Sequence, residues 1–284
     1  MKPPIPYLHG LTLGDVTIFY DSKVKKYRVH IETTHPAMEK VFIYAFQSYS
    51  LDGVIRKYPT KGGAVPYRWT LYTWINPQLG KILSNKDLGI VDIYAQKLEN
   101  IAAFISGLMD SDGSIIISIK RRKRLNYKPI VEYEIGLFNS NKELLIKIMK
   151  AMKMFNISLN IRKNCDLTKK TIRRGKRIVW ELYTSRTSEI KKLLPLLLSH
   201  MKNSERIERA LLLKSITEGK VPKDPTLIAE LREKINSKIS RKVHEYIKWA
   251  RECYKNKIKY LIYSDGTIVE QKVKIKDLSG RLLG

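Results

Sequence analysis

The 284-residue chain contains 54 Lys and Arg but only 27 Asp and Glu, which gives a formal net charge of +27 at pH 7. A chain of this length can bury one large core or two fused half-domains, so it needs neither disulfide bonds nor structural metal ions for stability. The positive charge attracts polyanions and makes nucleic acid the first candidate partner, although a basic protein of a hot or salty cytoplasm, a ribosomal protein and a membrane-surface protein stay compatible with charge alone.

The cysteines and the apolar runs limit the cellular compartments in which the protein is expected. Cys165 and Cys253 are the only cysteines and have no CxxC spacing, which argues against a disulfide framework and against a zinc ribbon. Residues 1–6 lack the apolar run of a signal peptide, and the apolar run at 193–198 is too short to cross a bilayer. We therefore expect a soluble protein that is not secreted and resides in the cytoplasm or an organellar matrix.

The first predicted element is a helix over residues 8–15 that ends at an aspartate. Alternating apolar and polar residues then predict strands over residues 16–20 and 27–33. A histidine–proline pair at 35–36 opens a second helix, and two further strands and a helix complete this unit. The order of the first unit is thus αββαββα.

Residues 105–112 repeat the pattern of the first helix, again with a terminal aspartate. Strands are predicted over residues 114–120 and 130–138, and the polar run 139–141 is a typical cap for the following helix. The segment Trp-Glu-Leu-Tyr-Thr at 180–184 matches Trp-Thr-Leu-Tyr-Thr in the first copy, so the whole unit is duplicated. The second copy is longer because of insertions in hairpin loops, for which 121–128 and 166–175 are the candidates.

The duplication predicts an α+β fold made of two pseudo-symmetric αββαββα half-domains, at residues 1–92 and 93–218. Residues 219–284 form a C-terminal extension. Around this boundary the pattern changes to amphipathic helices over 205–217 and 225–255, followed by a hairpin that turns at an Asp-Gly pair. The extension's long helix is rich in Lys and Arg, which suits a solvated outer face as well as DNA contact.

Small residues recur at four-residue spacing in both aspartate-tipped helices. Such residues leave one helix face nearly smooth, so that two helices can pack closely and bring their ends together. The residues concerned are Gly10 and Gly14 in the first helix, and Ala103, Gly107 and Ser111 in the second.

Close packing of these helices would make Asp15 and Asp112 neighbours. Two carboxylates at helix C-termini repel each other unless cations neutralise them, and hard oxygen ligands suit Mg²⁺. The backbone carbonyls of Gly14 and Ser111 would help to coordinate the metal. Paired metals can activate a water and stabilise the leaving oxygen of a phosphodiester. The alternative is that each aspartate only caps a helix end; Asp110 is expected to be an exposed carboxylate without an essential role.

These two segments resemble the motifs of LAGLIDADG homing endonucleases, in the single-chain form with two motifs per polypeptide. Residues 105–113 fit the motif closely, whereas the first copy has Val16 where the family usually has glycine and His9 where a small residue is common. The resemblance covers approximately residues 5–218. It implies an intron-encoded, monomeric enzyme without an obligate protein partner. Two four-stranded antiparallel sheets would form a saddle on double-stranded DNA, with Mg²⁺ or Mn²⁺ beneath a central seam of the two motif helices. Both strands would be cut across the minor groove, leaving short 3′ overhangs.

The resemblance also implies a polar residue after the second strand and a lysine in a late helix, both near the scissile phosphates. Asn139 and Lys202 occupy the approximate positions, and Thr33 or Glu32 is the weaker match in the first copy. Each could instead be a cap or an exposed lysine.

Outward-facing strand residues are the candidates for DNA contact, because a β-ribbon in the major groove presents every second side chain to the bases. Val29, Ile115, Ile117 and other apolar partners would pack inward. The alternative is an ordinary amphipathic sheet with a wet face. The candidates are Arg28, His30, Arg56, Tyr58, Arg68, Tyr72, Ser114, Ser118, Lys120, Arg122, Asn160, Arg162 and Lys176.

Two functions are compatible with the sequence. The presence of both Asp15 and Asp112 favours a metal-dependent, site-specific DNA endonuclease. The alternative is a LAGLIDADG protein that only binds nucleic acid, either an RNA maturase that assists intron splicing or a DNA-binding regulator. Maturases can keep both aspartates, so these residues do not exclude that role.

Overall fold

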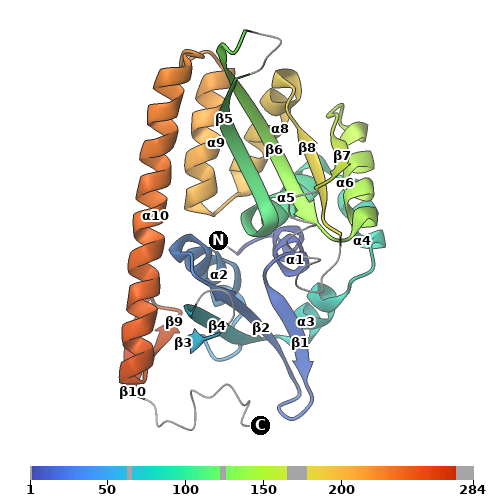
Figure 1. The fold of residues 1–284 in the computed structure, drawn as a ribbon. Coiled ribbons are helices and arrows are strands. Elements are labelled where there is room, and N and C mark those ends of the chain that lie inside the picture. Colours follow the sequence, from blue (N-terminus) through green and yellow to red (C-terminus); the bar gives the residue numbers. More distant parts are fainter. Residues whose placement is uncertain (1, 63–65, 122–125, 165–177, 273–284) are drawn as a thin grey trace. The chain divides into compact units, whose positions relative to one another are not determined.

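The structure is a computed structural model that describes residues 2–62, 66–121, 126–164 and 178–272. Two compact units make up the chain (Figure 1). Unit one contains Met1–Pro3, Asp15–Lys86 and Lys238–Gly284, and unit two contains Pro4–Gly14 and Asp87–Ser237. The first aspartate-tipped helix therefore belongs to unit two, together with the second.

Unit two is built on an antiparallel sheet with the strand order β5-β6-β8-β7. The long strands β5 and β6 pair along the whole of β5, and alternating isoleucines of β5 pack into the core. The strands are β5 (Gly113–Arg121), β6 (Pro129–Asn139), β7 (Asn160–Lys163) and β8 (Trp180–Thr184).

Helices cover one face and one edge of this sheet. Figure 1 shows α9 running beside β5, with which it is in contact. Buried leucines, isoleucines and methionines of the helices and strands form one continuous core. The helices of unit two are α1 (Ile5–Leu13), α4 (Gly89–Tyr94), α5 (Leu98–Asp112), α6 (Lys142–Met154), α8 (Thr187–His200), α9 (Ser204–Thr217) and the beginning of α10 (Pro225–Asn256).

Unit one contains a six-stranded antiparallel sheet with the order β1-β2-β4-β3-β9-β10. The expected four strands are present, and the hairpin of the extension adds two more because β9 pairs with β3. An edge strand presents unpaired N–H and C=O groups, and β9 satisfies those of β3. The elements are β1 (Thr17–Asp21), β2 (Lys26–Thr33), α2 (Pro36–Phe46), a 3₁₀ turn (Gln47–Tyr49), β3 (Val54–Lys61), β4 (Tyr67–Ile75), α3 (Pro77–Ser84), β9 (Ile258–Tyr263) and β10 (Ile268–Lys272).

A buried lysine fastens the extension to this sheet. The Nζ atom of Lys57 lies 3.8 Å from the ring centre of Trp249 on α10 and 4.3 Å from that of Trp69 on β4. It donates hydrogen bonds to both carboxylate oxygens of Glu39, at 2.8 and 2.7 Å. Burial lowers the pKa of Lys57, and the Glu39 charge opposes that shift. The part of α10 that belongs to unit one therefore buries one face inside that unit.

The predicted α+β class with antiparallel sheets is confirmed. Both copies have the expected helix and strand order, and the predicted strands agree with the observed ones to within one or two residues at each end. The short helix α4, which precedes α5, was not expected. The insertion at 166–175 lies outside the described residues.

Candidate active site

Helices α1 and α5 touch backbone to backbone at their glycines. A Cβ atom added at Gly10 would lie 2.1 Å from the carbonyl oxygen of Phe104, and one added at Gly107 would lie 2.1 Å from that of Tyr7. No side chain fits at such a distance. The small residues therefore serve the close approach that their spacing predicts.

The same approach continues to the C-terminal ends of both helices. A Cβ at Gly14 would lie 1.9 Å from Oγ of Ser111 and 3.1 Å from Oδ2 of Asp112. The backbone of Gly14 is thus directly beside the Asp112 carboxylate, which is half-buried. Asp15, which is exposed, follows Gly14 in the chain.

His9, which stands where LAGLIDADG motifs commonly have a small residue, packs inside unit two. Its imidazole is fully buried and meets the ring of Phe104 edge to face at 6.2 Å. Nδ1 of His9 lies 3.3 Å from the hydroxyl of Tyr94, a residue of α4. Burial raises the pKa of Tyr94 to about 12, so this hydroxyl stays protonated. The additional helix α4 therefore supplies a polar partner for the histidine.

Asp110 is buried, which corrects the expectation of an exposed helix-end carboxylate. Its Oδ2 accepts hydrogen bonds from the hydroxyl of Tyr7 at 2.7 Å and from the backbone N–H of Lys202 at 2.6 Å. The chain between α8 and α9 returns over the end of α5 and covers the carboxylate. Burial raises the pKa of Asp110, and these hydrogen bonds oppose the shift.

The beginning of α9 caps the end of α5. Nδ2 of Asn203 donates to the carbonyl of Asp110 at 3.2 Å, and the Arg206 guanidinium donates to the carbonyls of Met109 and Ser111, the latter at 2.6 Å. The carbonyl of Ser111, a predicted metal ligand, therefore already faces a positive charge. Sequence reasoning missed Arg206 because its partners are far away along the chain. The available signal was local, since Asn203 is a favourable N-cap residue for α9.

Asp110→Ala is expected to lower the free energy of unfolding by about 2–5 kcal/mol, because the Tyr7 hydroxyl and the Lys202 N–H would each lose a buried acceptor. Asp110→Asn keeps an acceptor oxygen and should cost far less. In the wild type the pKa of Asp110 is higher in the folded state than in the unfolded state. The ionised carboxylate therefore lowers the free energy of unfolding above the folded-state pKa, and this destabilisation disappears below the unfolded-state pKa. Chemical denaturation from neutral to acidic pH should show this dependence in the wild type and its loss in Asp110→Asn. Equal stability of Asp110→Ala and wild type would contradict the buried network.

Asn139 and Thr33 have matching positions in the two copies. Oδ1 of Asn139 accepts a hydrogen bond from the backbone N–H of Asn141 at 2.8 Å, and Oγ1 of Thr33 accepts one from that of His35 at 2.9 Å. Both side chains therefore support the turn from the second strand into the next helix. Lys202 lies between α8 and α9, with its backbone tied to Asp110.

The face of the unit-two sheet that lies opposite α5 and α6 displays the predicted polar residues. Ser114, Ser118 and Lys120 alternate with the buried Ile115 and Ile117, as predicted. Lys120 pairs with the carboxylate of Glu132 on β6 at 3.1 Å. Arg122 and Lys176 lie outside the described residues.

Arg162 is held by two carboxylates on this face. Its guanidinium contacts Glu134 at 2.6 Å and Glu181 at 2.9 Å, and it lies over the ring of Tyr183 at 4.1 Å. Burial raises the pKa of Glu134, and the hydrogen bond and charge of Arg162 oppose the shift. Asn160 lies on the same strand as Arg162, is paired with Tyr183 of β8 and is exposed. Sequence analysis proposed the arginine but missed its acidic partners.

The corresponding face of the unit-one sheet is more aromatic. Arg28 is only 8% exposed, and its guanidinium lies over the ring of Tyr72 at 3.8 Å. Burial, followed by the charge of Arg28, lowers the pKa of His30 and favours its neutral form. Tyr58 meets the ring of Tyr72 edge to face. Stacking thus restrains this cluster before any ligand binds.

Two further candidate arginines of this sheet are ion-paired. Arg68 contacts Glu32 at 2.9 Å, and Arg56 on β3 contacts Asp52, which lies just before the start of β3. Glu32, the weaker catalytic candidate, is therefore a partner of a candidate DNA contact.

Two features are absent from the part of the chain that the structure describes. Residues 2–62, 66–121, 126–164 and 178–272 contain no group of three or more His, Cys, Asp or Glu side chains arranged to hold a metal ion. Within the same ranges, every helix is too short or too polar to traverse a bilayer.

The chain is similar to a protein-family model and to solved structures. Residues 99–197 match the family model of the LAGLIDADG-like domain. The crystal structure of the LAGLIDADG homing endonuclease I-SmaMI bound to cleaved DNA is similar with a TM-score of 0.52 and 10% identity, covering 82% of this chain and 95% of that one. I-DmoI in complex with DNA and Mn gives a TM-score of 0.44 and 21% identity over 69% of this chain and 97% of its own. No curated protein sequence matches this chain.

Proposed function

We propose that this chain, of which residues 99–197 match the model of the LAGLIDADG-like domain, is a monomeric, intron-encoded endonuclease that cuts both strands of DNA at a specific site. The observation that carries the proposal is the contact between the Gly14 backbone and the Asp112 carboxylate. Asp15 follows Gly14 in the chain, so the Cα atoms of the two residues are about 3.8 Å apart. Two carboxylates near one point favour a bound cation.

The donor atoms suit Mg²⁺ or Mn²⁺. Asp15 and Asp112 would hold the metal through carboxylate oxygens, with the Gly14 carbonyl as an additional ligand. When bound, the metal supplies a polarised water and stabilises charge on the leaving oxygen of the phosphodiester. The Ser111 carbonyl already accepts a hydrogen bond from Arg206, so a metal ion would have to share this oxygen with the guanidinium. The proposed role of Arg206 is to fix the end of α5 and to add positive charge beside Asp112.

The strand faces would read the DNA. Arginine forms bidentate hydrogen bonds with guanine, and carboxylates accept from cytosine. The Arg162 cluster and the Arg68–Glu32 pair offer both kinds of group, already oriented by ion pairs. Lys202 and Asn139 are proposed to lie near the scissile phosphates, and the net charge of +27 supplies the attraction to DNA.

A nucleic-acid-binding protein without catalysis, such as an RNA maturase or a DNA-binding regulator, is the second candidate. The contact between Arg206 and the Ser111 carbonyl favours it, because a positive group already occupies this end of α5 without any metal.

Selection from a library of randomised duplexes, followed by a cleavage assay, tests the proposal. Selected plasmids should become linear with Mg²⁺ or Mn²⁺ and stay intact with EDTA, because removal of the metal leaves the two carboxylates without their cation. Duplexes that bind but are never cut would contradict the nuclease, and tighter binding of folded intron RNA than of any duplex would support the maturase.

A further inference from the structure

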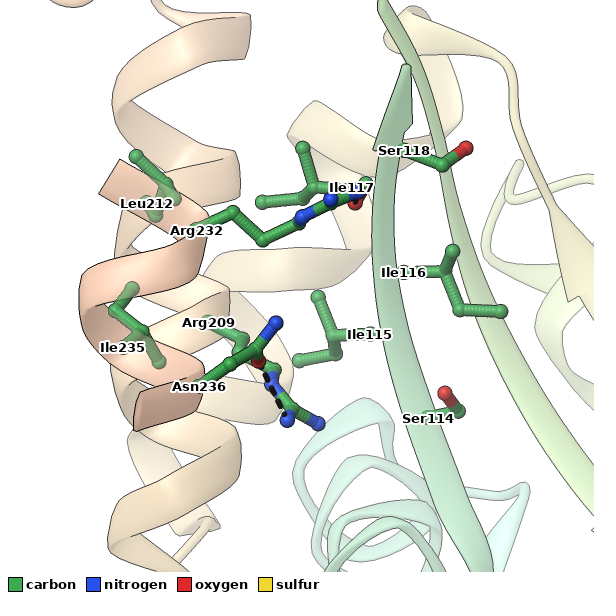
Figure 2. A pocket seen from close by; sticks show the side chains of 10 residues that line it. All are labelled: Ser114, Ile115, Ile116, Ile117, Ser118, Arg209, Leu212, Arg232, Ile235 and Asn236. Carbon is green, nitrogen blue, oxygen red and sulfur yellow. Dashed lines mark hydrogen bonds between the residues drawn. The ribbon is translucent and has the colours of Figure 1, made fainter. Parts of the chain in front are cut away.

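A cavity of about 280 Å³ lies in unit two between the free edge of β5 and the helices α9 and α10. Figure 2 shows its walls: Ile115 and Ile117 face it from the strand, and Arg209 of α9 and Arg232 of α10 reach toward the strand. A water occupies about 30 Å³ of liquid volume, so the cavity has room for a tetrahedral anion with some of its hydration.

Two positively charged side chains, Arg209 and Arg232, line this cavity. Arg209 donates to Oδ1 of Asn236 at 3.1 Å, and Arg232 donates to the carbonyl of Ile117 at a long 3.4 Å. The Nε of Arg232 is buried and has no hydrogen-bond partner. In the part of the chain that the structure describes, neither arginine forms an ion pair with a carboxylate.

Three arginines of the sheet faces behave differently, because Arg162 contacts two carboxylates and Arg56 and Arg68 contact one each. Arg28 instead stacks on Tyr72. Guanidinium groups that lack such partners, and that line a hollow from two separate helices, are suited to bind an anion from outside the protein.

The position of the cavity suggests which anion this is. Strand β5 is an edge strand of the unit-two sheet, and its other face carries Ser114 and Ser118. Figure 2 shows these two serines pointing away from the arginines, across the same strand. DNA that reached the serines would pass the rim of the cavity, where its backbone carries one negative charge about every 1.7 Å of helix axis.

We propose that Arg209, Arg232 and Asn236 bind a phosphate group of the DNA backbone beside β5. This inference rests on the proposed binding of duplex DNA and adds a contact made by the extension that follows the duplicated part of the chain. A phosphate contact positions the duplex without reading its sequence. The extension therefore takes part in DNA docking in unit two.

Binding of a selected duplex at several salt concentrations tests the contact. Arg232→Gln and Arg209→Gln should each weaken binding about tenfold or more and reduce the slope of log K against log salt by about one. Arg241→Gln removes the same charge from an exposed position of α10 outside the cavity and serves as the matched control. Circular dichroism and thermal unfolding check that the variants fold. Arg232→Lys, which keeps the charge, should recover most of the slope.

Inorganic phosphate separates the cavity from the DNA. At constant ionic strength, phosphate in place of chloride should raise the melting temperature of the wild type more than that of Arg232→Gln, in the absence of any nucleic acid. A phosphate effect with an unchanged salt slope would identify a site for free phosphate and overturn the DNA contact. Absence of both effects would overturn the site. If no duplex binds the wild type, the proposed function fails, whereas the phosphate measurement still tests the cavity.

Discussion

Asp112→Asn is expected to reduce double-strand cleavage at least about 10²-fold, the loss that removal of one electrostatic group from an active site commonly produces. Asparagine keeps the shape of the side chain but lacks the charge that holds a divalent cation. DNA affinity should not fall, because the substitution removes a negative charge near phosphates. Asp15→Asn is expected to behave in the same way. The measurements are single-turnover cleavage of a selected duplex and its binding in Ca²⁺.

Asp92→Asn is a suitable control, because Asp92 is an exposed carboxylate that pairs with Lys147 on α6. Its cleavage rate should equal that of the wild type. Full activity of either motif variant would refute the two-carboxylate site. Loss of DNA binding together with cleavage would indicate a structural role for the aspartate instead.

Gly107→Ala is expected to destabilise the protein by about 3 kcal/mol or more, because the added methyl group would overlap the Tyr7 carbonyl and force two helix backbones apart. Gly10→Ala should have a similar effect through Phe104. In an ordinary helix the same substitution would add up to about 1 kcal/mol of stability. Urea denaturation followed by circular dichroism measures the difference.

Gly89→Ala is the matched control for the helix-packing variants. Gly89 is the first residue of α4, and the nearest atom that a Cβ there would meet belongs to the flexible carboxylate of Asp87, at 3.2 Å. We expect its stability to change by less than about 1 kcal/mol. If Gly107→Ala were as stable as this control, the close contact between α1 and α5 would be wrong.

Local patterns were sufficient for most of the fold. Alternation in residues 114–120 identified β5, and its buried isoleucines lie on the predicted face. Asn141 caps α6 through the backbone N–H of Leu144, as the polar run before that helix predicted. Helix spacing of Gly10 and Gly107 predicted the close packing of α1 and α5. All these features depend on residues a few positions apart.

Features that depend on distant partners were not predictable. Nothing near Asp110 in the sequence shows that Tyr7 and the Lys202 backbone will bury it. The same holds for Arg206, whose partners lie at the end of α5. The ion pairs of Arg162 arise because β6 and β8 bring glutamates beside it, which depends on strand order.

The strand order of unit one has a consequence for biosynthesis. Its sheet combines β1 to β4 from the beginning of the chain with β9 and β10 from the end, whereas unit two is complete at Ser237. On the ribosome, unit two can therefore fold before β9, the second pairing partner of β3, has been synthesised. A late frameshift or stop codon would leave Lys57 without its cover of Trp249 and expose an open strand edge to chaperones and proteases.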